Sequence, residues 1–347
     1  MNIAIVTGAS SGIGEEILRG LVRERGAFGS LPFGQIWAVA RSAERLETLQ
    51  KELGPALIRI FALDLTAPGA MDIISDTLAE ESPNVGLLVN CAGIGRVGEL
   101  TNQTPADQRA MVALNCSAPA ELTSICLPYM IRAGKEADFR NGPRILNIAS
   151  SAAFMPQPGF ATYAATKAFL VSFSRAVNEE LRPHNIASTT VCPGPVSTDF
   201  LAHATGKATA SFSGIKSLFV ARPDKLAVSS IRAVRNGRAV LVYGFSQKVF
   251  HVLAKILPAR FLMFLASRMA ESKPDAPVMA EPAPSASAPG KDAPISMTLL
   301  LPVRNGDDDA KEAPPTGVSE RPSTVPILST SAEAMAILRA YPGRYST

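Results

Sequence analysis

The sequence has few cysteines, few histidines and little excess charge. The four cysteines, Cys91, Cys116, Cys126 and Cys192, show no C-x-x-C spacing. They therefore indicate reduced core thiols in a cytosolic protein, and we expect a cytoplasmic location. The three histidines are scattered, which argues against a metal site. The net charge is only +4 and no dense Lys/Arg block occurs, so nothing indicates a nucleic-acid surface.

Long uninterrupted apolar runs are also missing. The first apolar run, Ile3 to Val6, is too short for a signal peptide and leads directly into a glycine loop. The stretch 246–270 is strongly apolar, but Lys255, Pro258 and Arg260 interrupt it, which excludes a transmembrane helix there. A hydrophobic content of 47% over 347 residues still suffices for one large α/β domain with appendages, or for two modest domains.

Short apolar runs alternate with helical patterns over residues 1–245. We expect helices that start near Glu15 and Ser42, and others over 71–81, 105–132, 163–181 and 223–236. The strands are expected at 2–7, 35–40, 57–65, 85–90, 144–150, 185–194 and 239–244. Such alternation predicts an α/β fold with a doubly wound, seven-stranded parallel sheet, the Rossmann fold.

A strand, a glycine turn and a helix start follow one another at the N-terminus. The turn has the spacing G-x-x-x-G-x-G, with Gly8, Gly12 and Gly14. Glycines let the backbone approach a pyrophosphate, and the start of a helix offers free N–H groups. The context therefore predicts a dinucleotide-binding unit, with these cofactor-binding candidates: Thr7, Gly8, Ser10, Ser11, Gly12, Ile13 and Gly14.

The ends of the next strands indicate how the rest of a dinucleotide would be held. The second strand ends in Ala40 and Arg41 without a carboxylate. A guanidinium suits a 2′-phosphate, which favours NADP(H) over NAD(H), although Arg41 could instead only begin a solvated helix. Asp64 and Leu65 close the third strand, where a carboxylate could accept a hydrogen bond from the adenine amino group. Asn90, Ala92 and Gly93 at the fourth strand end would let a flat cofactor lie against the backbone.

The stretch SSAAFMPQPGFATYAATK (150–167) holds the candidate chemistry. Tyr163 and Lys167 are four residues apart, so on a helix they project from the same face. The lysine ammonium is expected to lower the pKa of the phenol toward neutral pH. Ser150, thirteen residues before the tyrosine, could bind the same substrate oxygen. The Y-x-x-x-K pattern alone is common by chance on solvated helices, and it gains weight from the glycine turn upstream.

Two further regions would complete the site. Asn115 lies inside the apolar helix expected at 105–132, where it needs hydrogen-bond partners, and Pro119 predicts a local kink. Pro193, Gly194, Val196 and Thr198 follow the sixth strand and could wrap a nicotinamide carboxamide. Residues 200–220 are typical of a mobile substrate lid. We expect specificity to depend on the loops 151–160 and 200–220.

Taken together, residues 1–245 resemble a short-chain dehydrogenase/reductase. TGASSGIG (7–14) is similar to the glycine loop of that family, NCAG (90–93) to its N-x-A-G strand end, and PGPVST (193–198) to its segment after the sixth strand. Ser150, Tyr163 and Lys167 match its catalytic residues, and Asn115 falls where its active-site asparagine belongs. Cys91 stands where many members have a second asparagine, a departure that we expect to be harmless.

The resemblance implies an oxidoreductase that interconverts a small carbonyl compound and a secondary alcohol. Tyr163 would be the general acid or base, and Lys167 would lower its pKa and bind the nicotinamide ribose. Ser150 would donate a hydrogen bond to the substrate oxygen, and Asn115 would hold a water in a proton relay. The family also implies a homo-oligomer. Two rival hypotheses are a regulatory module that binds nucleotide without turnover and a membrane-associated scaffold.

Beyond residue 245 the resemblance ends. The segment 246–270 has three interpretations: a helical extension that closes over the substrate cleft, a subunit contact, or an amphipathic segment on a membrane surface. From residue 271 the chain is rich in Pro, Ala and Ser, which predicts a largely disordered tail over 271–347. Short exceptions are an apolar patch in ISMTLLLPV and a terminal helix expected at 331–341.

Overall fold

The computed structural model describes residues 1–24, 33–198, 200, 204, 220–258 and 260–264. Residues 25–32, nearly all of the lid expected at 200–220 and the whole of 271–347 lie outside the described residues. The expectations for those segments stay predictions.

Seven parallel strands form one sheet in the order β3-β2-β1-β4-β5-β6-β7, which confirms the predicted doubly wound architecture. The strand order reverses between β1 and β4, so the carboxyl ends of these two strands open a crevice where doubly wound sheets bind ligands. The strands are β1 (Asn2–Thr7), β2 (Gln35–Ala40), β3 (Ile58–Ala62), β4 (Asn84–Asn90), β5 (Arg144–Ile148), β6 (Ala187–Pro193) and β7 (Val240–Tyr243).

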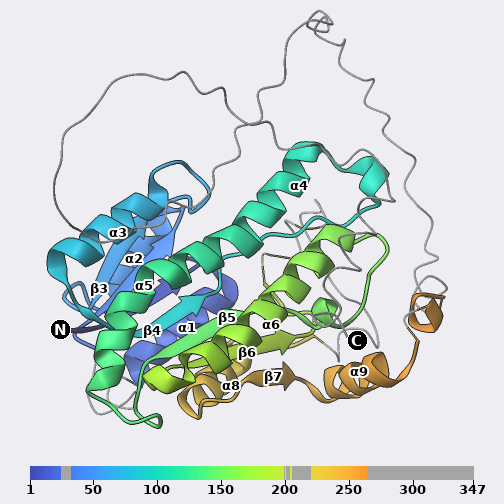
Figure 1. Cartoon of the computed structure of the whole chain (residues 1–347). Helices are drawn as coiled ribbons and strands as arrows, with labels where there is room; N and C mark the ends of the chain where they lie inside the picture. The colour runs from blue at the N-terminus through green and yellow to red at the C-terminus, as the bar shows by residue number, and fades with distance from the viewer. Residues whose placement is uncertain (25–32, 199, 201–203, 205–219, 259, 265–347) are drawn as a thin grey trace, which may run out of the picture. The chain divides into compact units, whose positions relative to one another are not determined.

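Helices cover both faces of the sheet (Figure 1). On one face α1 (Gly12–Arg23), α2 (Ala43–Leu53) and α8 (Pro223–Arg235) enclose a core cluster, and on the other α3 (Ala70–Glu81), α5 (Ala118–Lys135) and the end of α6 (Ala161–Leu181) enclose a second one. In α1 the apolar residues Ile17, Leu18 and Leu21 share one face and are fully buried, which explains why this segment folds as an amphipathic helix. Replacing Leu18 by Ala would cost about 2–5 kcal/mol of stability.

The long helix expected at 105–132 is interrupted. α4 (Pro105–Val112) and α5 are joined by a π-helical turn over Ala113–Ser117 that contains Asn115. Pro119 has no N–H to offer the carbonyl four residues earlier, so the break follows from the same residue that predicted a kink. The continuous helical stretch Pro105–Lys135 is apolar and long enough to cross a membrane, yet Leu122, Cys126 and Met130 on it are buried in the core against the sheet.

Four strands, β3, β5, β6 and β7, are shorter than the sequence predicted, and local contacts explain this for β3 and β6. β3 ends at Ala62 and not at residue 65, because the Asp64 carboxylate accepts hydrogen bonds from the Thr66 N–H (2.9 Å) and hydroxyl (2.7 Å), which turns the chain. β6 begins at Ala187 and not at 185, because Asn185 adopts a left-handed conformation (φ +61°) that ends a short 3-10 turn.

After β7 the chain turns at Gly244, which has φ +97°, into α9 (Phe245–Ile256). Residues 260–264 are helical again, and the remainder of the predicted 246–270 extension lies outside the described residues. α9 contacts β7 and the short 3-10 helix η3 (Ser151–Phe154), so it packs near the carboxyl ends of the strands.

Candidate active site

A cavity of about 590 Å³ lies at the carboxyl ends of β1, β4, β5 and β6. It brings the glycine turn, the end of β4, the start of α6 and the segment after β6 into one space. The predicted site residues that line it are Gly8, Ser11, Gly12, Ile13, Gly14, Ala92, Gly93, Ser150, Tyr163, Lys167, Pro193, Gly194, Val196 and Thr198. Those outside its lining are Thr7, Ser10, Arg41, Asp64, Leu65, Asn90 and Asn115.

The glycine turn has the shape that a dinucleotide pyrophosphate requires. Gly8 and Gly12 have positive φ values of +67° and +57°. A Cβ on Gly14 would stand 2.2 Å from the Gly8 carbonyl oxygen, so the turn closes only with glycine there. The Ser11 side chain makes no capping hydrogen bond, which leaves the first N–H groups of α1 to a ligand. The chain's own geometry therefore fits the diphosphate of a dinucleotide.

Thr7 and Asn90 build the floor of the site and do not face the cavity. The Thr7 hydroxyl donates to the Val89 carbonyl (3.1 Å) and accepts from the N–H groups of Cys91 (3.0 Å) and Ala92 (3.1 Å). These bonds tie β1 to the end of β4. The Asn90 amide donates to Asn147 (2.9 Å) and Thr123 (3.3 Å) inside the core. Their cofactor-binding roles stay predictions. Both side chains hold in place the backbone that a cofactor would contact.

Arg41 and Asp64 lie at the ends of β2 and β3, beyond the cavity. Both side chains are exposed, whereas the neighbouring Leu65 is buried. Hydrogen bonds from Thr66 hold the pKa of the Asp64 carboxyl below its ordinary value, and the charge of Arg41 lowers it further. The two side chains are therefore close enough to interact, at the edge of the sheet where the adenosine end of a dinucleotide is expected.

Tyr163 and Lys167 project from the same buried face of α6, which confirms the spacing argument. Both line the cavity, and the Lys167 Nζ lies 5.6 Å from the centroid of the Tyr163 ring. Ser150 follows β5 and caps η3, where its Oγ accepts a hydrogen bond from the Ala152 N–H (3.1 Å). The same side chain lies near enough to the Tyr163 hydroxyl to affect its pKa. Ser150 thus lines the same cavity as Tyr163 and Lys167, which are thirteen and seventeen positions away in the chain.

The expectation that Lys167 lowers the pKa of Tyr163 is wrong for this arrangement. Burial raises the pKa of Tyr163 to about 12, and the nearby Ser150 side chain opposes that only partly. Burial also lowers the pKa of Lys167 to about 8. The ammonium donates a hydrogen bond to the Ile148 carbonyl (3.1 Å), so its charge is directed at the backbone of β5. Desolvation therefore outweighs the attraction between the two groups.

Asn115 clamps the loop after β4. Its amide accepts from the Ile94 N–H (2.9 Å), donates to the Ile94 carbonyl (2.8 Å) and donates to the Thr166 hydroxyl (3.0 Å). A Cβ on Gly93 would stand 3.1 Å from the Asn115 Oδ1 and 3.2 Å from the Lys167 Nζ, so Gly93 fits between them. The partners that a buried asparagine needs are thus present, and its role in a proton relay stays a prediction.

Sequence reasoning missed an aromatic wall and one helix. Phe160 stacks on Tyr163 with ring centroids 4.2 Å apart, and Phe200 lies 5.5 Å from the same ring. From α9, Ser246, Gln247 and Phe250 also line the cavity. Their spacing of one, three and four positions would have indicated a shared helix face, but nothing in the sequence shows that this face meets the site. Among the described residues of 246–270, α9 therefore lines the cavity, and its role as a closing segment stays a prediction.

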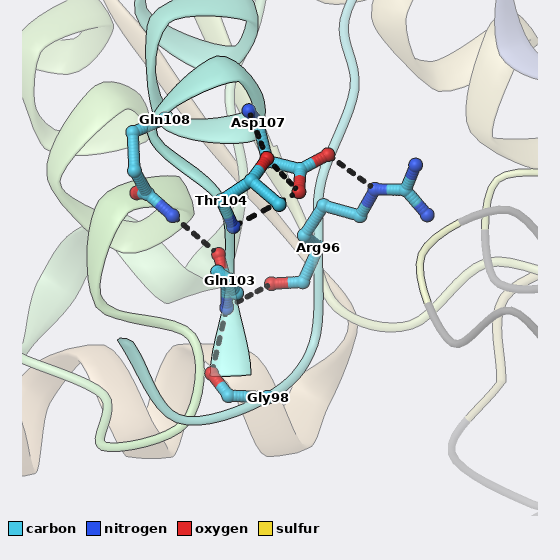
Figure 2. Close-up of polar contacts among 6 residues, drawn as sticks. All are labelled: Arg96, Gly98, Gln103, Thr104, Asp107 and Gln108. Carbon is cyan, nitrogen blue, oxygen red and sulfur yellow. Dashed lines mark hydrogen bonds and ion pairs between the residues drawn. The ribbon is translucent and has the colours of Figure 1, made fainter. Parts of the chain in front are cut away.

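A polar network holds the start of α6 in place. Figure 2 shows Gln103 donating to the carbonyl oxygens of Gly98 (2.7 Å) and Arg96 (3.3 Å), while Gln108 donates to Gln103 (2.7 Å). Gln108 in turn accepts a hydrogen bond from Thr162, the residue before Tyr163. At the N-terminus of α4, the helix that carries Gln108, Thr104 and Asp107 form a capping box, and the Arg96 guanidinium donates to the Asp107 carboxylate (3.2 Å). The loop after β4 is thereby tied to the residue beside the phenol.

The cysteines are free, as the sequence indicated. Burial raises the pKa values of Cys91, Cys126 and Cys192 to about 12, so these thiols stay neutral at neutral pH. Within the described part of the chain no three His, Cys, Asp or Glu side chains are grouped as metal ligands would be. The titratable side chains that line the cavity among the described residues are Cys91, Tyr163 and Lys167, and of these Lys167 has the pKa nearest to neutrality.

Comparison with known proteins now decides the family. The family model described as short chain dehydrogenase matches residues 2–208. This chain belongs to the short-chain dehydrogenase/reductase family. It is accordingly an NAD(P)-dependent oxidoreductase.

Individual relatives agree with this assignment. Nodulation protein G of Rhizobium meliloti is 33% identical over 203 residues, 58% of this chain and 76% of that protein. An NADP-dependent 3-hydroxy acid dehydrogenase of Shigella flexneri is 32% identical over 56% of this chain and 72% of its own length. A short-chain dehydrogenase from Sphingobium yanoikuyae, solved with NADPH, has the same fold, with a TM-score of 0.60, 24% identity, and coverage of 82% of this chain and 99% of that one.

Proposed function

We propose that this short-chain dehydrogenase/reductase uses NADP(H) to interconvert a carbonyl and a secondary alcohol, with Tyr163 as the proton donor or acceptor. The observation that carries the proposal is that the side chains of Ser150, Tyr163 and Lys167 meet in the cavity that the glycine turn also lines. A general acid, a hydrogen-bond donor and a cation beside a dinucleotide turn are the parts that carbonyl reduction requires.

The pKa of Tyr163 fits the reductive direction. With a pKa raised to about 12, the phenol keeps its proton throughout the neutral range and can donate it to a developing alkoxide. The Ser150 hydroxyl lines the same cavity near that phenol and is proposed to bind the same oxygen. A bound cofactor supplies the hydride, and its oxidised ring adds a positive charge that favours the phenolate needed for the reverse reaction.

Lys167 is proposed to bind the nicotinamide ribose and to return a proton to Tyr163. Its pKa near 8 allows it to be either charged or neutral close to physiological pH, as a proton relay requires. Asn115 is proposed to hold the water at the far end of this relay. The π-helical turn supports that role, because Pro119 provides no N–H for the Asn115 carbonyl.

The preference for NADP(H) is proposed from Arg41. Its guanidinium follows β2 and is exposed, and β2 itself ends without a carboxylate, since the nearby Asp64 follows β3. A 2′-phosphate there would gain a charge-assisted contact, whereas an NAD-specific site would place an acidic side chain at this position. The NADP-dependent relative named above agrees with this preference.

The substrate is proposed to be a small carbonyl compound with an apolar substituent. Phe160, Phe200 and Phe250 line the cavity around the phenol, and the amides of Gln157 and Gln247 add two polar contacts. An aromatic wall with a few placed polar groups favours an apolar group whose position is fixed by one or two hydrogen bonds. We also propose a homo-oligomer, which sedimentation velocity on the full chain would test.

NADPH oxidation by the purified protein, measured against a panel of ketones, steroids, sugars and acyl thioesters, tests the proposal. The proposal expects turnover with at least one apolar ketone and its loss in Tyr163→Phe. A regulatory module would instead bind NADPH, seen as quenching or shift of its fluorescence, and would oxidise it with no member of the panel.

A further inference from the structure

The last part of the described chain has an unusual charge balance. Residues 225–264 contain no Asp or Glu, whereas they hold the following basic residues: Lys225, Arg232, Arg235, Arg238, Lys248, Lys255 and Arg260. The rest of the chain contains both basic and acidic residues, so the net charge of the whole chain is only +4. This segment builds α8, β7 and α9, which follow one another along one side of the molecule (Figure 1). The basic character is therefore concentrated on neighbouring elements.

α9 has an inner face that lines the active-site cavity and an outer face that is exposed. Its inner face contributes Gln247 and Phe250 to the active-site cavity, and His251 packs on Phe154 with ring centroids 4.1 Å apart. Its outer face is an apolar stripe of exposed side chains. Phe245 is 83% exposed and Ile256 is 73% exposed. The complete stripe consists of Phe245, Val249, Val252, Leu253 and Ile256.

A second cavity, of about 540 Å³, adjoins one end of this stripe. Phe245 lines it, together with three cationic side chains, Arg232, Arg238 and Lys248. All three are exposed, and no acidic side chain is in the lining. Within the described residues none of the three makes a side-chain hydrogen bond or an ion pair. The cavity is thus positively charged and lies beside an exposed apolar surface.

We propose that α9 and this cationic cavity dock the protein on a membrane that contains anionic phospholipids. The apolar stripe would enter the boundary between headgroups and acyl chains, and Arg232, Arg238 and Lys248 would contact the lipid phosphates. The stripe is exposed and apolar, and it lies beside a cluster of cations on a segment without acidic residues. This surface is therefore complementary to an anionic bilayer in both polarity and charge.

A second copy of the chain fits this surface less well. In a two-fold symmetric dimer the same patch faces itself, so Arg232, Arg238 and Lys248 would meet the same three cations of the other copy. Like charges at an interface oppose association, and no acidic side chain lines the cavity to compensate for them. An anionic lipid surface would neutralise the three cationic side chains. This difference favours the membrane over a second copy of the chain as the partner of this surface.

Co-sedimentation of the full-length protein with vesicles tests the docking, and it needs neither cofactor nor substrate. We expect binding to vesicles of phosphatidylcholine with phosphatidylglycerol, and about tenfold weaker binding to phosphatidylcholine alone. Raising the salt concentration is expected to weaken the binding. Leu253→Glu and the double variant Arg238→Glu/Lys248→Glu should each reduce it by about tenfold or more.

Matched controls are available on the opposite part of the molecule. Ile73 on α3 is 48% exposed, close to the 43% of Leu253, so Ile73→Glu adds the same charge to a similar surface and should bind vesicles as the natural protein does. Lys51→Glu on α2 is the corresponding control for charge reversal. Inorganic phosphate at millimolar concentration should not release the protein, whereas release would show that the cavity takes free phosphate.

The proposal is wrong if the protein sediments equally with both kinds of vesicle, or if Leu253→Glu binds as tightly as Ile73→Glu. Sedimentation velocity without lipid gives a separate readout, in which a dimer that dissociates only in Leu253→Glu would show that a second copy covers the stripe. Reductase activity in solution is not used, so a failure of the proposed function would leave this result intact.

Discussion

The Lys167 ammonium donates a hydrogen bond of 3.1 Å to the carbonyl oxygen of Ile148. One end of this contact is the helix that carries Tyr163, and the other is the last residue of β5, two positions before Ser150. The contact therefore fixes the distance between the two elements that deliver the phenol and the serine. It also buries a charge, since only 5% of Lys167 is exposed and its pKa falls to about 8.

This burial predicts a stability that rises with pH. Below pH 8 the folded protein must keep a buried ammonium, and between pH 8 and 10.5 it releases the proton while the unfolded chain retains it. Folding should therefore gain about 2 kcal/mol from Lys167 between pH 7 and pH 9.5. Urea unfolding of the natural protein and of Lys167→Met at both pH values isolates the effect, because the variant lacks the titrating group. Equal pH dependence in the two proteins would contradict the buried ammonium.

The reductive reaction should lose efficiency above pH 8. Tyr163 keeps its proton up to about pH 12, so the first group to titrate as the pH rises is Lys167. Loss of the ammonium removes the cation proposed to bind the ribose, and kcat/KM for ketone reduction should fall by about tenfold per pH unit above that point. Steady-state kinetics between pH 6 and pH 10 provide the test, and a flat profile across this range would rule out a role for the Lys167 charge.

Arg41 should control the choice between the two cofactors. Arg41→Ala removes the proposed contact with the 2′-phosphate, and a charge-assisted hydrogen bond of about 1.5–3 kcal/mol corresponds to a fall of about 10- to 100-fold in kcat/KM for NADPH. The value for NADH should change by less than about twofold, since NADH has no such phosphate. Lys51→Ala, at the other end of α2, is a control that removes a positive charge away from the site. Equal losses with both cofactors would show that Arg41 has a structural role only.

Gln108 should matter to the active site although it does not line the cavity. It connects Gln103, which holds the loop after β4, to Thr162 beside Tyr163. Gln108→Leu leaves both partners without their bond, and we expect a loss of about 1–3 kcal/mol in the free energy of unfolding, with a fall in kcat at unchanged KM for NADPH. The neighbouring exposed Arg109→Leu is the control, expected to stay within about 0.5 kcal/mol of the natural protein. A normal kcat in Gln108→Leu would mean that the network does not position the phenol.

The sequence was sufficient for the doubly wound fold and for the shared face of Tyr163 and Lys167, because the alternation of strands with helices and the helix periodicity are local patterns. It was insufficient for the pKa of Tyr163. The effect of a lysine one turn away depends on where its Nζ points and on how far both groups are desolvated. The Nζ bonds the Ile148 carbonyl, nineteen residues away in the chain. Burial decides the sign here, and burial depends on tertiary packing.

The role of α9 shows the same limit. The spacing of its apolar residues indicates an amphipathic helix, and the sequence left three interpretations of its role. Only the packing of Gln247 shows which face turns inward: a Cβ on Gly194 would stand 2.7 Å from the Gln247 Nε2. That contact joins residues far apart in the chain, so no local pattern contains it.

The most direct test of the account is single-turnover reduction of a ketone substrate by Tyr163→Phe with saturating NADPH, monitored by the loss of NADPH absorbance. Removing one hydroxyl from a buried, stacked ring should leave the fold and NADPH binding intact. The loss of the general acid should slow hydride transfer by about 10²- to 10⁴-fold. A rate within about twofold of the natural protein would contradict the account, because proton donation by Tyr163 would then contribute nothing to the reaction.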